Sequence, residues 1–372
     1  MKIVHHTLIQ DTPGDQLQLV SLHFGEPGRG PKVAIQASLH ADEVPGMLVA
    51  HHLRQRLLDL EAQGHLLGEV VLVPMANPLG LRQWGLRGFQ GRFDMNSGEN
   101  FNRRYADLCA PVVAAVRDKV GPDAQANVAL VRQALREAVQ ALQPANALEH
   151  LRQTLLGLAI DADAVLDLHC DGVAVMHLYT TPATWPQAEV LARCIGARVA
   201  LLAEHSGGEP FDEACSQVWV DIAEALGAEV PLPPACMAAT IELRGEMDVR
   251  HELAREDAEG ILRFLRARGV LQADDKPLPA LLCEPTPLAG SIPMAAPHGG
   301  MVVARREVGS PVKQGEPLID VIDPLSGQVS TLCAPVDGLF FAHDCKRFAY
   351  KGMALGKVAG REAQRSGALL SV

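Results

Sequence analysis

The chain has 372 residues, with 33 lysines and arginines against 44 aspartates and glutamates, and its formal net charge at pH 7 is -11. This acidic balance argues against sequence-independent binding of nucleic acid and against an anionic membrane surface, because both need a basic face. No apolar run of about 18 residues is present, so we expect no membrane span. The length predicts one large domain and a smaller one.

Targeting and redox signals indicate a cytoplasmic protein. The N-terminal residues lack the apolar segment and the small cleavage-site residues of a signal peptide. The 8 cysteines are scattered without a CxxC pair, which excludes a cysteine-based zinc knuckle. We therefore expect reduced, mostly buried thiols.

The first part of the chain alternates short apolar runs with helical patterns. Val33–Ala37 predicts a strand, and residues 45–60 carry leucines at helical spacing. Glu69–Pro74 predicts a second buried strand, which ends at the proline. A long loop rich in glycine and arginine follows from Asn77 to Tyr105, and loops of this length are usually functional or disordered.

The alternation continues to about residue 268. Residues 123–158 are rich in alanine, leucine, glutamine and glutamate, and predict a helical insertion. The remaining expected elements are the strand Ala164–His169, the helix Trp185–Ile195, the strands Val199–Leu202 and Ala238–Leu243, and the helix Glu252–Arg268. Strands separated by helices predict an α/β fold, with a mixed, mostly parallel sheet covered by helices on both faces.

Composition changes near residue 275. Residues 274–280 are rich in aspartate and proline and predict a linker, after which short strand-like runs alternate with turns. This pattern predicts a small all-β domain. We place the larger domain at residues 1–280 and the smaller one at residues 281–372.

Two strand ends carry groups suited to a metal. His40 and Glu43 follow the first predicted strand, three residues apart, and His169 closes a later strand with Asp167 on the same face. Imidazole and carboxylate suit Zn²⁺, and Asp167 could fix the imidazole of His169. Taken singly, these residues also fit an exposed histidine, a glutamate in a first helical turn, a satisfied core histidine and a structural carboxylate.

A third strand contains Glu242 within the apolar run TIEL. A carboxylate in such a strand is costly to bury without a partner or a role, and at a strand end it can act as a general base. The alternative is an ion pair with Arg244 or Arg250, and Glu246 competes for the same role.

The long loop contains Arg92, Asn102 and Arg103. A guanidinium can grip a carboxylate with two hydrogen bonds, and an amide can donate to a carboxylate or a developing oxyanion. Several arginines in one loop ordinarily form a solvated surface. Here they lie in the chain between two candidate sets of metal ligands, and this position favours a role in the site.

The motifs occur in the order HADE, NPLG, NRRY, DLH and TIEL over about residues 30–250. This order resembles the zinc carboxypeptidase superfamily and, within it, the succinylglutamate desuccinylase/aspartoacylase family. The resemblance implies one zinc ion per chain, held by His40, Glu43 and His169. It also implies a deacylase that cleaves the amide bond of a carboxylate-bearing N-acyl amino acid with metal-activated water.

The resemblance implies roles for four further residues. Arg92 resembles the arginine that polarises the scissile carbonyl, Asn102 and Arg103 resemble the pair that holds a substrate carboxylate, and Glu242 resembles the general base. The loop from Arg92 to Arg103 is longer than in the aspartoacylases proper, so Arg87 is an alternative to Arg92.

The tail resembles a biotinyl/lipoyl-like barrel, but the turn Asp323–Gly327 lacks the lysine of a carrier. We interpret it as a structural or pocket-capping module. The expected partner is a small N-acyl amino acid, without nucleic acid or membrane, and a homo-oligomer is left open. The alternatives for function are a zinc peptidase acting on short peptides and a non-catalytic binding protein with a degenerate site.

Overall fold

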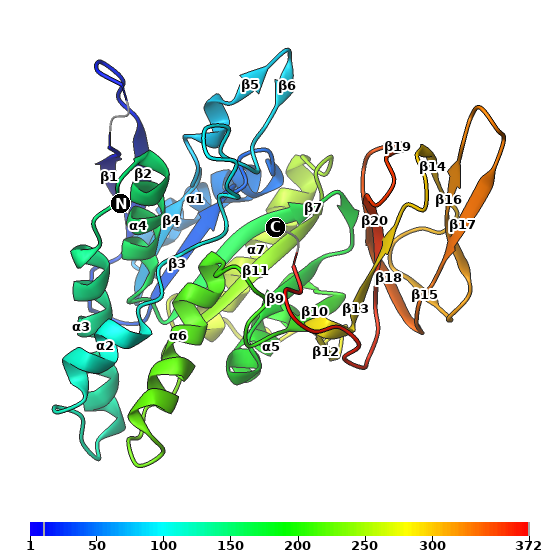
Figure 1. Ribbon diagram of the computed structural model, residues 1–372. Coiled ribbons are helices and arrows are strands. Elements are labelled where there is room, and N and C mark those ends of the chain that lie inside the picture. Colours follow the sequence, from blue (N-terminus) through cyan, green and yellow to red (C-terminus); the bar gives the residue numbers. More distant parts are fainter. Residues whose placement is uncertain (10–11, 371–372) are drawn as a thin grey trace.

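Within residues 1–9 and 12–370, which the computed structural model describes, a nine-stranded sheet forms the centre of the larger part (Figure 1). The strand order is β1-β2-β4-β3-β7-β11-β9-β10-β12. These strands are β1 (Lys2–Thr7), β2 (Gln18–Phe24), β3 (Lys32–Ala37), β4 (Glu69–Val73), β7 (Ala164–Asp171), β9 (His177–Thr180), β10 (Val199–Leu202), β11 (Met237–Gly245) and β12 (Pro285–Pro287).

The sheet is mixed and mostly parallel, as predicted. Parallel pairs join β4, β3, β7 and β11 in sequence, and also β9, β10 and β12. Antiparallel pairs occur at β1–β2, β2–β4 and β11–β9. The edge strand β1 escaped the sequence analysis because its side chains are mostly exposed and give no buried run.

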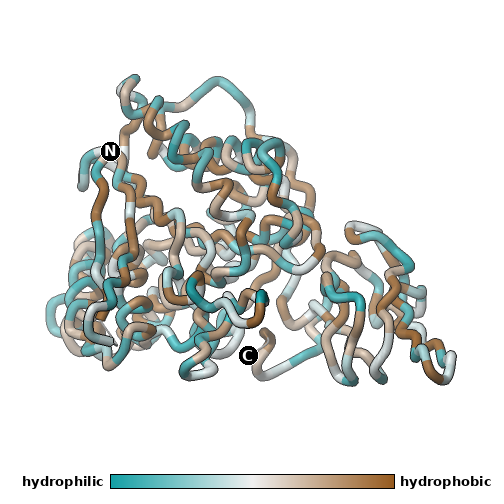
Figure 2. The backbone as a smooth tube through the Cα atoms, turned by 90° about the horizontal axis from the view of Figure 1, so that it is seen from above, coloured by the Kyte–Doolittle hydropathy of each residue, from teal (hydrophilic) through white to brown (hydrophobic). Residues whose placement is uncertain are grey.

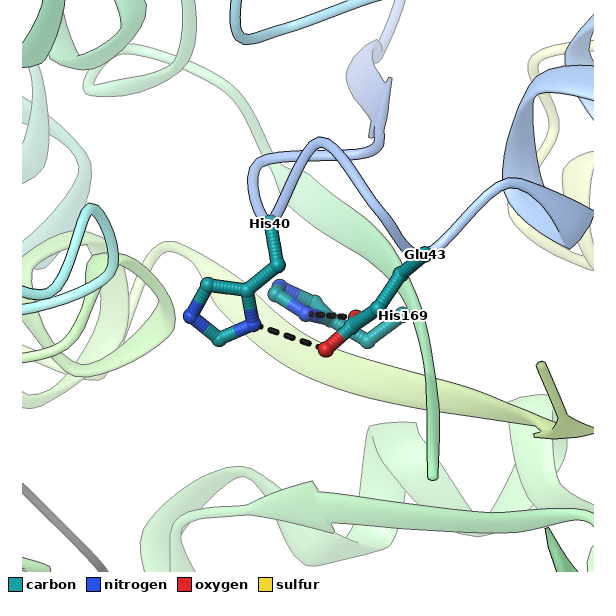
Figure 3. Close-up of side chains that lie close together, drawn as sticks. All are labelled: His40, Glu43 and His169. Carbon is teal, nitrogen blue, oxygen red and sulfur yellow. Dashed lines mark hydrogen bonds and ion pairs between the residues drawn. The ribbon is translucent and has the colours of Figure 1, made fainter. Parts of the chain in front are cut away.

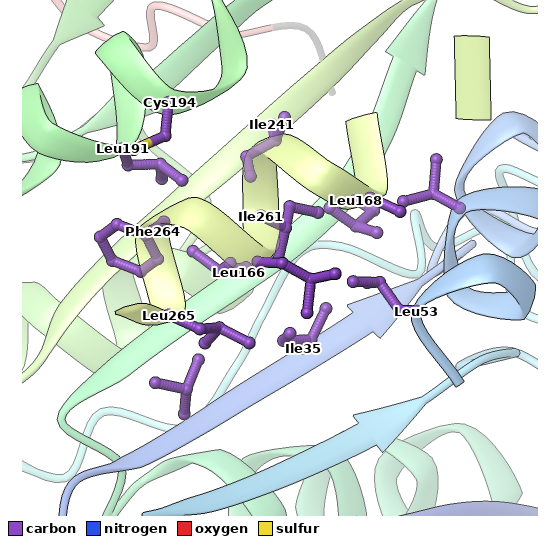
Figure 4. Packing of buried hydrophobic residues seen from close by; sticks show 14 of the residues in the cluster. Ile35, Leu53, Leu166, Leu168, Leu191, Cys194, Ile241, Ile261, Phe264 and Leu265 are labelled. Carbon is purple, nitrogen blue, oxygen red and sulfur yellow. The ribbon is translucent and has the colours of Figure 1, made fainter. Parts of the chain in front are cut away.

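Helices cover both faces of the sheet. One face carries α1 (Pro45–Ala62), α5 (Trp185–Ile195) and α7 (His251–Ala267), and the other carries α2 (Cys109–Val116), α3 (Ala124–Ala141), α4 (Ala147–Ala159) and α6 (Phe211–Leu226). Figure 4 shows Leu53, Ile261 and Phe264 packing onto Ile35 and Leu166 of the sheet. This burial fixes the strands and therefore the positions of their polar ends.

Two predicted segments differ in detail from the structure. The long loop contains the 3-10 helix η1 (Gly80–Arg82) and a small hairpin of β5 (Trp84–Gly85) and β6 (Gly88–Phe89). The insertion at 123–158 forms α3 and α4 with a break at Pro144, and Asp123 and Asn146 cap the two helices.

The C-terminal part is built from two antiparallel sheets around a core of its own. Its strands are β13 (Ser291–Ala295), β14 (Gly300–Ala304), β15 (Ser310–Val312), β16 (Pro317–Ile322), β17 (Val329–Cys333), β18 (Gly338–His343), β19 (Phe348–Ala349) and β20 (Ala354–Ala359). The short β8 (Val173–Ala174) extends from the larger part and pairs with β18. The 3-10 helices η2 (Pro182–Thr184) and η3 (Leu288–Gly290) complete the described elements. The barrel class and the domain boundary near residue 280 stay predictions.

None of the described helices combines the length and the apolar character needed to cross a membrane.

Candidate active site

The ends of β3 and β7 bring His40, Glu43 and His169 together. Because these strands are parallel neighbours, both of their carboxyl ends lie at the same edge of the sheet. The turn after β3 is set by Ser38, which has a positive φ of 58° and whose hydroxyl donates to the Glu43 carbonyl at 2.8 Å. Helix α1 then begins at Pro45. The turn of residues 38–44, called the ligand turn below, is therefore fixed at both of its ends.

A second segment packs tightly against this turn at Gly91. The Ala41 N–H donates to the Gly91 carbonyl at 2.9 Å. A Cβ atom at Gly91 would lie 2.1 Å from the Asp42 nitrogen, so only glycine permits this approach. The close contact places the next residue, Arg92, beside the ligand turn.

The three side chains face one another (Figure 3). His40 Nδ1 lies 2.8 Å from Glu43 Oε1, and His169 Nδ1 lies 2.7 Å from Glu43 Oε2. All three residues are buried, and one ligand atom from each lies within 4.8 Å of the others. These atoms form a compact set of two imidazole nitrogens and a carboxylate.

The outer nitrogens of both imidazoles are also held. His40 Nε2 lies 2.8 Å from Asn100 Oδ1, and His169 Nε2 lies 2.9 Å from Asp167 Oδ2. Both partners are acceptors, so each ring donates through Nε2–H and can turn the lone pair of Nδ1 toward Glu43. Two lone pairs that face a carboxylate need a positive charge between them, and this donor set fits a zinc ion.

The electrostatics of the cluster support that conclusion. Burial and the nearby Arg92 lower the pKa of His40. Burial opposes protonation of His169 as well, but Asp167 and Glu43 raise its pKa well above the usual value. Although burial alone would raise it, His40 and His169 hold the pKa of Glu43 well below its ordinary value. A positive charge is therefore stabilised in the cluster, whether a proton or a metal ion carries it.

Glu242 lies on β11 directly beside His169 of β7 in the parallel register. Its Oε2 atom is buried and has no hydrogen-bond partner among the described residues. Burial, followed by the charge of Glu43, raises the pKa of Glu242 to about 8. The carboxyl is therefore ready to exchange a proton near neutral pH.

The structure contradicts the proposed ion pairs of Glu242. Arg244 pairs with Asp257 at 2.5 Å, and Arg250 pairs with Asp248 at 2.9 Å. Glu246, the other candidate for the general base, lies outside the pocket, and its carboxylate accepts a hydrogen bond from the Cys345 thiol at 3.4 Å.

The long loop supplies the other predicted side chains. Arg92 is partly exposed, and its Nη1 lies 3.2 Å from both His40 Nδ1 and Glu43 Oε1. Arg87 lies in the exposed turn between β5 and β6, outside the pocket, so Arg92 is the better placed of the two. Buried Arg103 donates to the Asn102 carbonyl at 2.7 Å, and the Asn102 side-chain oxygen accepts the Phe211 N–H at the start of α6.

All seven predicted residues line one pocket of about 380 Å³. The larger part of the chain adds Asp171 and Tyr179, and the C-terminal part adds Lys357 and Arg365. A larger cavity of about 760 Å³ lies between the two parts near Arg198 and contains none of the predicted residues. The chemistry-bearing groups therefore gather in the smaller cavity.

Sequence analysis missed several residues that line the pocket or hold its ligands. Asp171 carried a usable signal, because it follows His169 by two residues and a strand alternates its faces. Asn100, which fixes His40, lies in a loop without periodicity. Lys357 and Arg365 are far from every motif, so nothing local connects them with the site.

Comparisons with known proteins agree with this geometry. The profile of the succinylglutamate desuccinylase/aspartoacylase catalytic domain matches residues 29–268. A search of curated proteins found no match. Among solved structures, a protein of this family from Shewanella amazonensis is 30% identical with a TM-score of 0.85, covering 96% of this chain and 98% of that chain.

Two further structures are similar. A succinylglutamate desuccinylase/aspartoacylase from Shewanella frigidimarina is 27% identical with a TM-score of 0.85, covering 96% of this chain and 97% of that one. The ectoine utilization protein EutE (DoeB) from Ruegeria pomeroyi is 15% identical with a TM-score of 0.66, covering 96% and 94% of the two chains, and shares the fold. The residues that match the profile are more than half of the chain, and they include the ligand turn and the strands β7 and β11. This chain therefore belongs to the succinylglutamate desuccinylase/aspartoacylase family.

Proposed function

We propose that the chain is a zinc-dependent hydrolase that cleaves the amide bond of a carboxylate-bearing N-acyl amino acid. The observation that carries the proposal is the unpartnered carboxylate oxygen of Glu242, in the same pocket as the cluster of His40, Glu43 and His169. A metal-ligand set beside a proton-accepting carboxyl is the arrangement that metal-assisted hydrolysis requires.

His40, Glu43 and His169 would hold the zinc ion and leave a fourth position open, as catalytic rather than structural sites do. A zinc ion held there would lower the pKa of a water molecule and polarise the substrate carbonyl. Asn100 and Asp167 keep the two imidazoles in the orientation that this requires, through their contacts with the outer nitrogens.

Glu242 acts on the proton. Its Oε2 atom takes a proton from the attacking water, and the same carboxyl then delivers that proton to the nitrogen of the leaving amine. Without a metal the pKa of Glu242 is about 8. A zinc ion in the neighbouring cluster would lower it toward neutral, where the carboxyl can both accept and release a proton. Arg92 donates hydrogen bonds to the carbonyl oxygen as negative charge develops there.

Asn102 and Arg103 orient the substrate by its carboxylate. Both are buried and both line the pocket, so a charge held there is largely removed from water. A few arginines in a cleft determine the local field, so the net charge of -11 does not prevent an anionic substrate from binding.

A substrate panel tests the proposal. The protein, purified with zinc, is offered N-acyl amino acids and matched dipeptides, and amine release is measured. Hydrolysis of the N-acyl amino acids with near-stoichiometric bound zinc supports a deacylase. Preferential cleavage of dipeptides indicates the peptidase alternative instead. Absence of both zinc and hydrolysis would contradict the enzyme assignment and favour a binding protein.

We also propose a cytoplasmic location and a diffusible small molecule as the partner, without nucleic acid or membrane. The proposal follows from the acidic composition and the free cysteines found in the described residues. Cell fractionation tests it, and recovery of the protein in a membrane or extracellular fraction would contradict it.

A further inference from the structure

An apolar part of the pocket lining is completed by the C-terminal segment, residues 365–370. After β20 the chain turns back from the C-terminal part toward the large sheet (Figures 1 and 2). Leu369 and Leu370 pack with Leu201, Leu288 and Tyr179 in a single cluster. All five of these residues line the pocket that holds the metal-ligand set.

Specific hydrogen bonds hold the segment in place. The Leu369 N–H donates to the Ser206 carbonyl at 2.8 Å. Arg365 Nη1 donates to the Leu369 carbonyl at 2.9 Å, and its Nη2 donates to the Leu288 carbonyl at 3.1 Å. The Arg365 N–H also donates to the Ala289 carbonyl at 3.1 Å. The segment is therefore a fixed wall whose apolar side chains face the pocket.

The two cations on this side hold the protein itself. The guanidinium of Arg365 is bonded to two backbone carbonyls, and the Lys357 ammonium pairs with Asp171 at 2.5 Å. A substrate carboxylate placed against the side chains of Leu369 and Leu370 would lose water without gaining a hydrogen-bond donor from them. Arg92 and Arg103, the arginines that the proposed function assigns to the substrate, line the same pocket.

We propose that the C-terminal segment is a specificity-determining wall that selects an uncharged, apolar group on the substrate. The substrate class is then an N-acyl amino acid with one carboxylate, directed to Arg103, and an apolar acyl group or side chain against Leu369 and Leu370. The inference rests on the proposed function and narrows it, because it disfavours a second carboxylate such as that of a succinyl group.

Binding measurements test the wall independently of turnover. Zinc-loaded Glu242→Gln protein is titrated by calorimetry with two matched pairs. N-butyrylalanine and N-succinylalanine differ in the acyl group, whereas N-acetylleucine and N-acetylaspartate differ in the side chain. We expect the apolar member of at least one pair to bind about 10-fold or more tighter, a typical range for discrimination by an apolar pocket. The pair that discriminates identifies the group that contacts the wall.

Two variants connect the preference with the segment. Leu369→Lys should reduce the preference for the apolar member at least 10-fold, because it provides a cation for the second carboxylate. Leu325→Lys is the matched control, since Leu325 is 96% exposed in the turn between β16 and β17 and should leave the ratio unchanged. If Leu369→Lys fails to fold, as judged by circular dichroism and zinc content, Leu370→Lys replaces it.

Equal or tighter binding of the dicarboxylates overturns the inference, as does a ratio that neither lysine variant of the wall changes. Lack of binding by all four ligands overturns it as well. Hydrolysis by the unmodified protein distinguishes the two levels of the proposal. Turnover of N-acyl amino acids without the expected preference rejects the wall alone, whereas absence of turnover together with absence of zinc rejects the proposed function.

Discussion

The two sides of the pocket are built in different ways. The ligand side uses side chains at the ends of buried parallel strands, where His40 and His169 are fixed by packing and by outer hydrogen bonds. The other side uses a C-terminal segment whose position depends on backbone carbonyls and on one arginine, Arg365. The first arrangement suits chemistry that tolerates little displacement, and the second suits a surface that can vary with the substrate.

The largest effect is expected from removing a ligand. His40→Ala should lose both bound zinc and hydrolysis, because two remaining ligands hold the metal poorly and Glu43 loses a partner. Metal analysis and amine release measure the two losses. His205→Ala removes an exposed imidazole and should change neither. Retained zinc in His40→Ala would contradict the ligand assignment.

The second-largest effect is expected from replacing the proposed general base. Glu242→Gln should keep zinc but lower kcat by about 10²- to 10⁴-fold, the usual contribution of a general base. Glu246→Gln, on a carboxyl outside the pocket, serves as the control and should keep normal turnover. Normal turnover in Glu242→Gln would show that another group takes the proton.

A smaller effect is expected from loosening the C-terminal segment that forms the wall. Arg365→Ala removes two hydrogen bonds to carbonyls, each contributing about 1 kcal/mol, so the segment loosens. We expect KM for an apolar N-acyl amino acid to rise about 10-fold while kcat and zinc content change little. Arg361→Ala is the control because Arg361 is exposed and pairs only across the surface with Glu284. A large fall in kcat with unchanged KM would instead give Arg365 a role in the chemistry.

The pH dependence of stability gives the smallest effect. In metal-free protein the pKa of Glu242 is raised to about 8, above its ordinary value of 4.5, so the folded state binds this proton more tightly than the unfolded state. That contribution is complete below pH 4.5 and is lost as the pH rises through 8. Glu242→Gln should therefore gain stability relative to the unmodified protein as the pH rises across this window.

Urea unfolding in the presence of a chelator measures this difference at several pH values. Glu229→Gln, on an exposed glutamate, should follow the unmodified protein throughout. A constant difference between Glu242→Gln and the unmodified protein would show that Glu242 titrates at an ordinary pKa in the fold.

Sequence information was sufficient where local pattern and chemistry coincide. The strands that carry His169 and Glu242 begin as buried apolar runs and carry their polar groups toward the end, which is a strong local signal. The fold class and the family followed from the order of such motifs. The edge strand β1 was missed because its side chains are mostly exposed, and β9 was missed because a run of four residues is too short to give a pattern.

The apolar side of the pocket was beyond sequence reasoning for another reason. Lys357 and Leu369 reach the site only because the C-terminal part packs beside the sheet, and that contact depends on tertiary structure rather than on spacing. Their partners, Asp171 and Ser206, are more than 150 residues earlier in the chain. No periodicity or motif connects segments at that separation.

The ion pair of Asp171 with Lys357 has a consequence for dissecting the molecule. Together with the pairing of β8 and β18, it fastens the C-terminal part to the strand that presents His169. Expression of residues 1–280 alone would leave Asp171 without its cation and would expose the apolar cluster around Leu201 to water. A catalytic fragment cut at that position should aggregate, so chimaeras that exchange C-terminal parts need the complementary charge and the leucine-bearing segment to be transferred together.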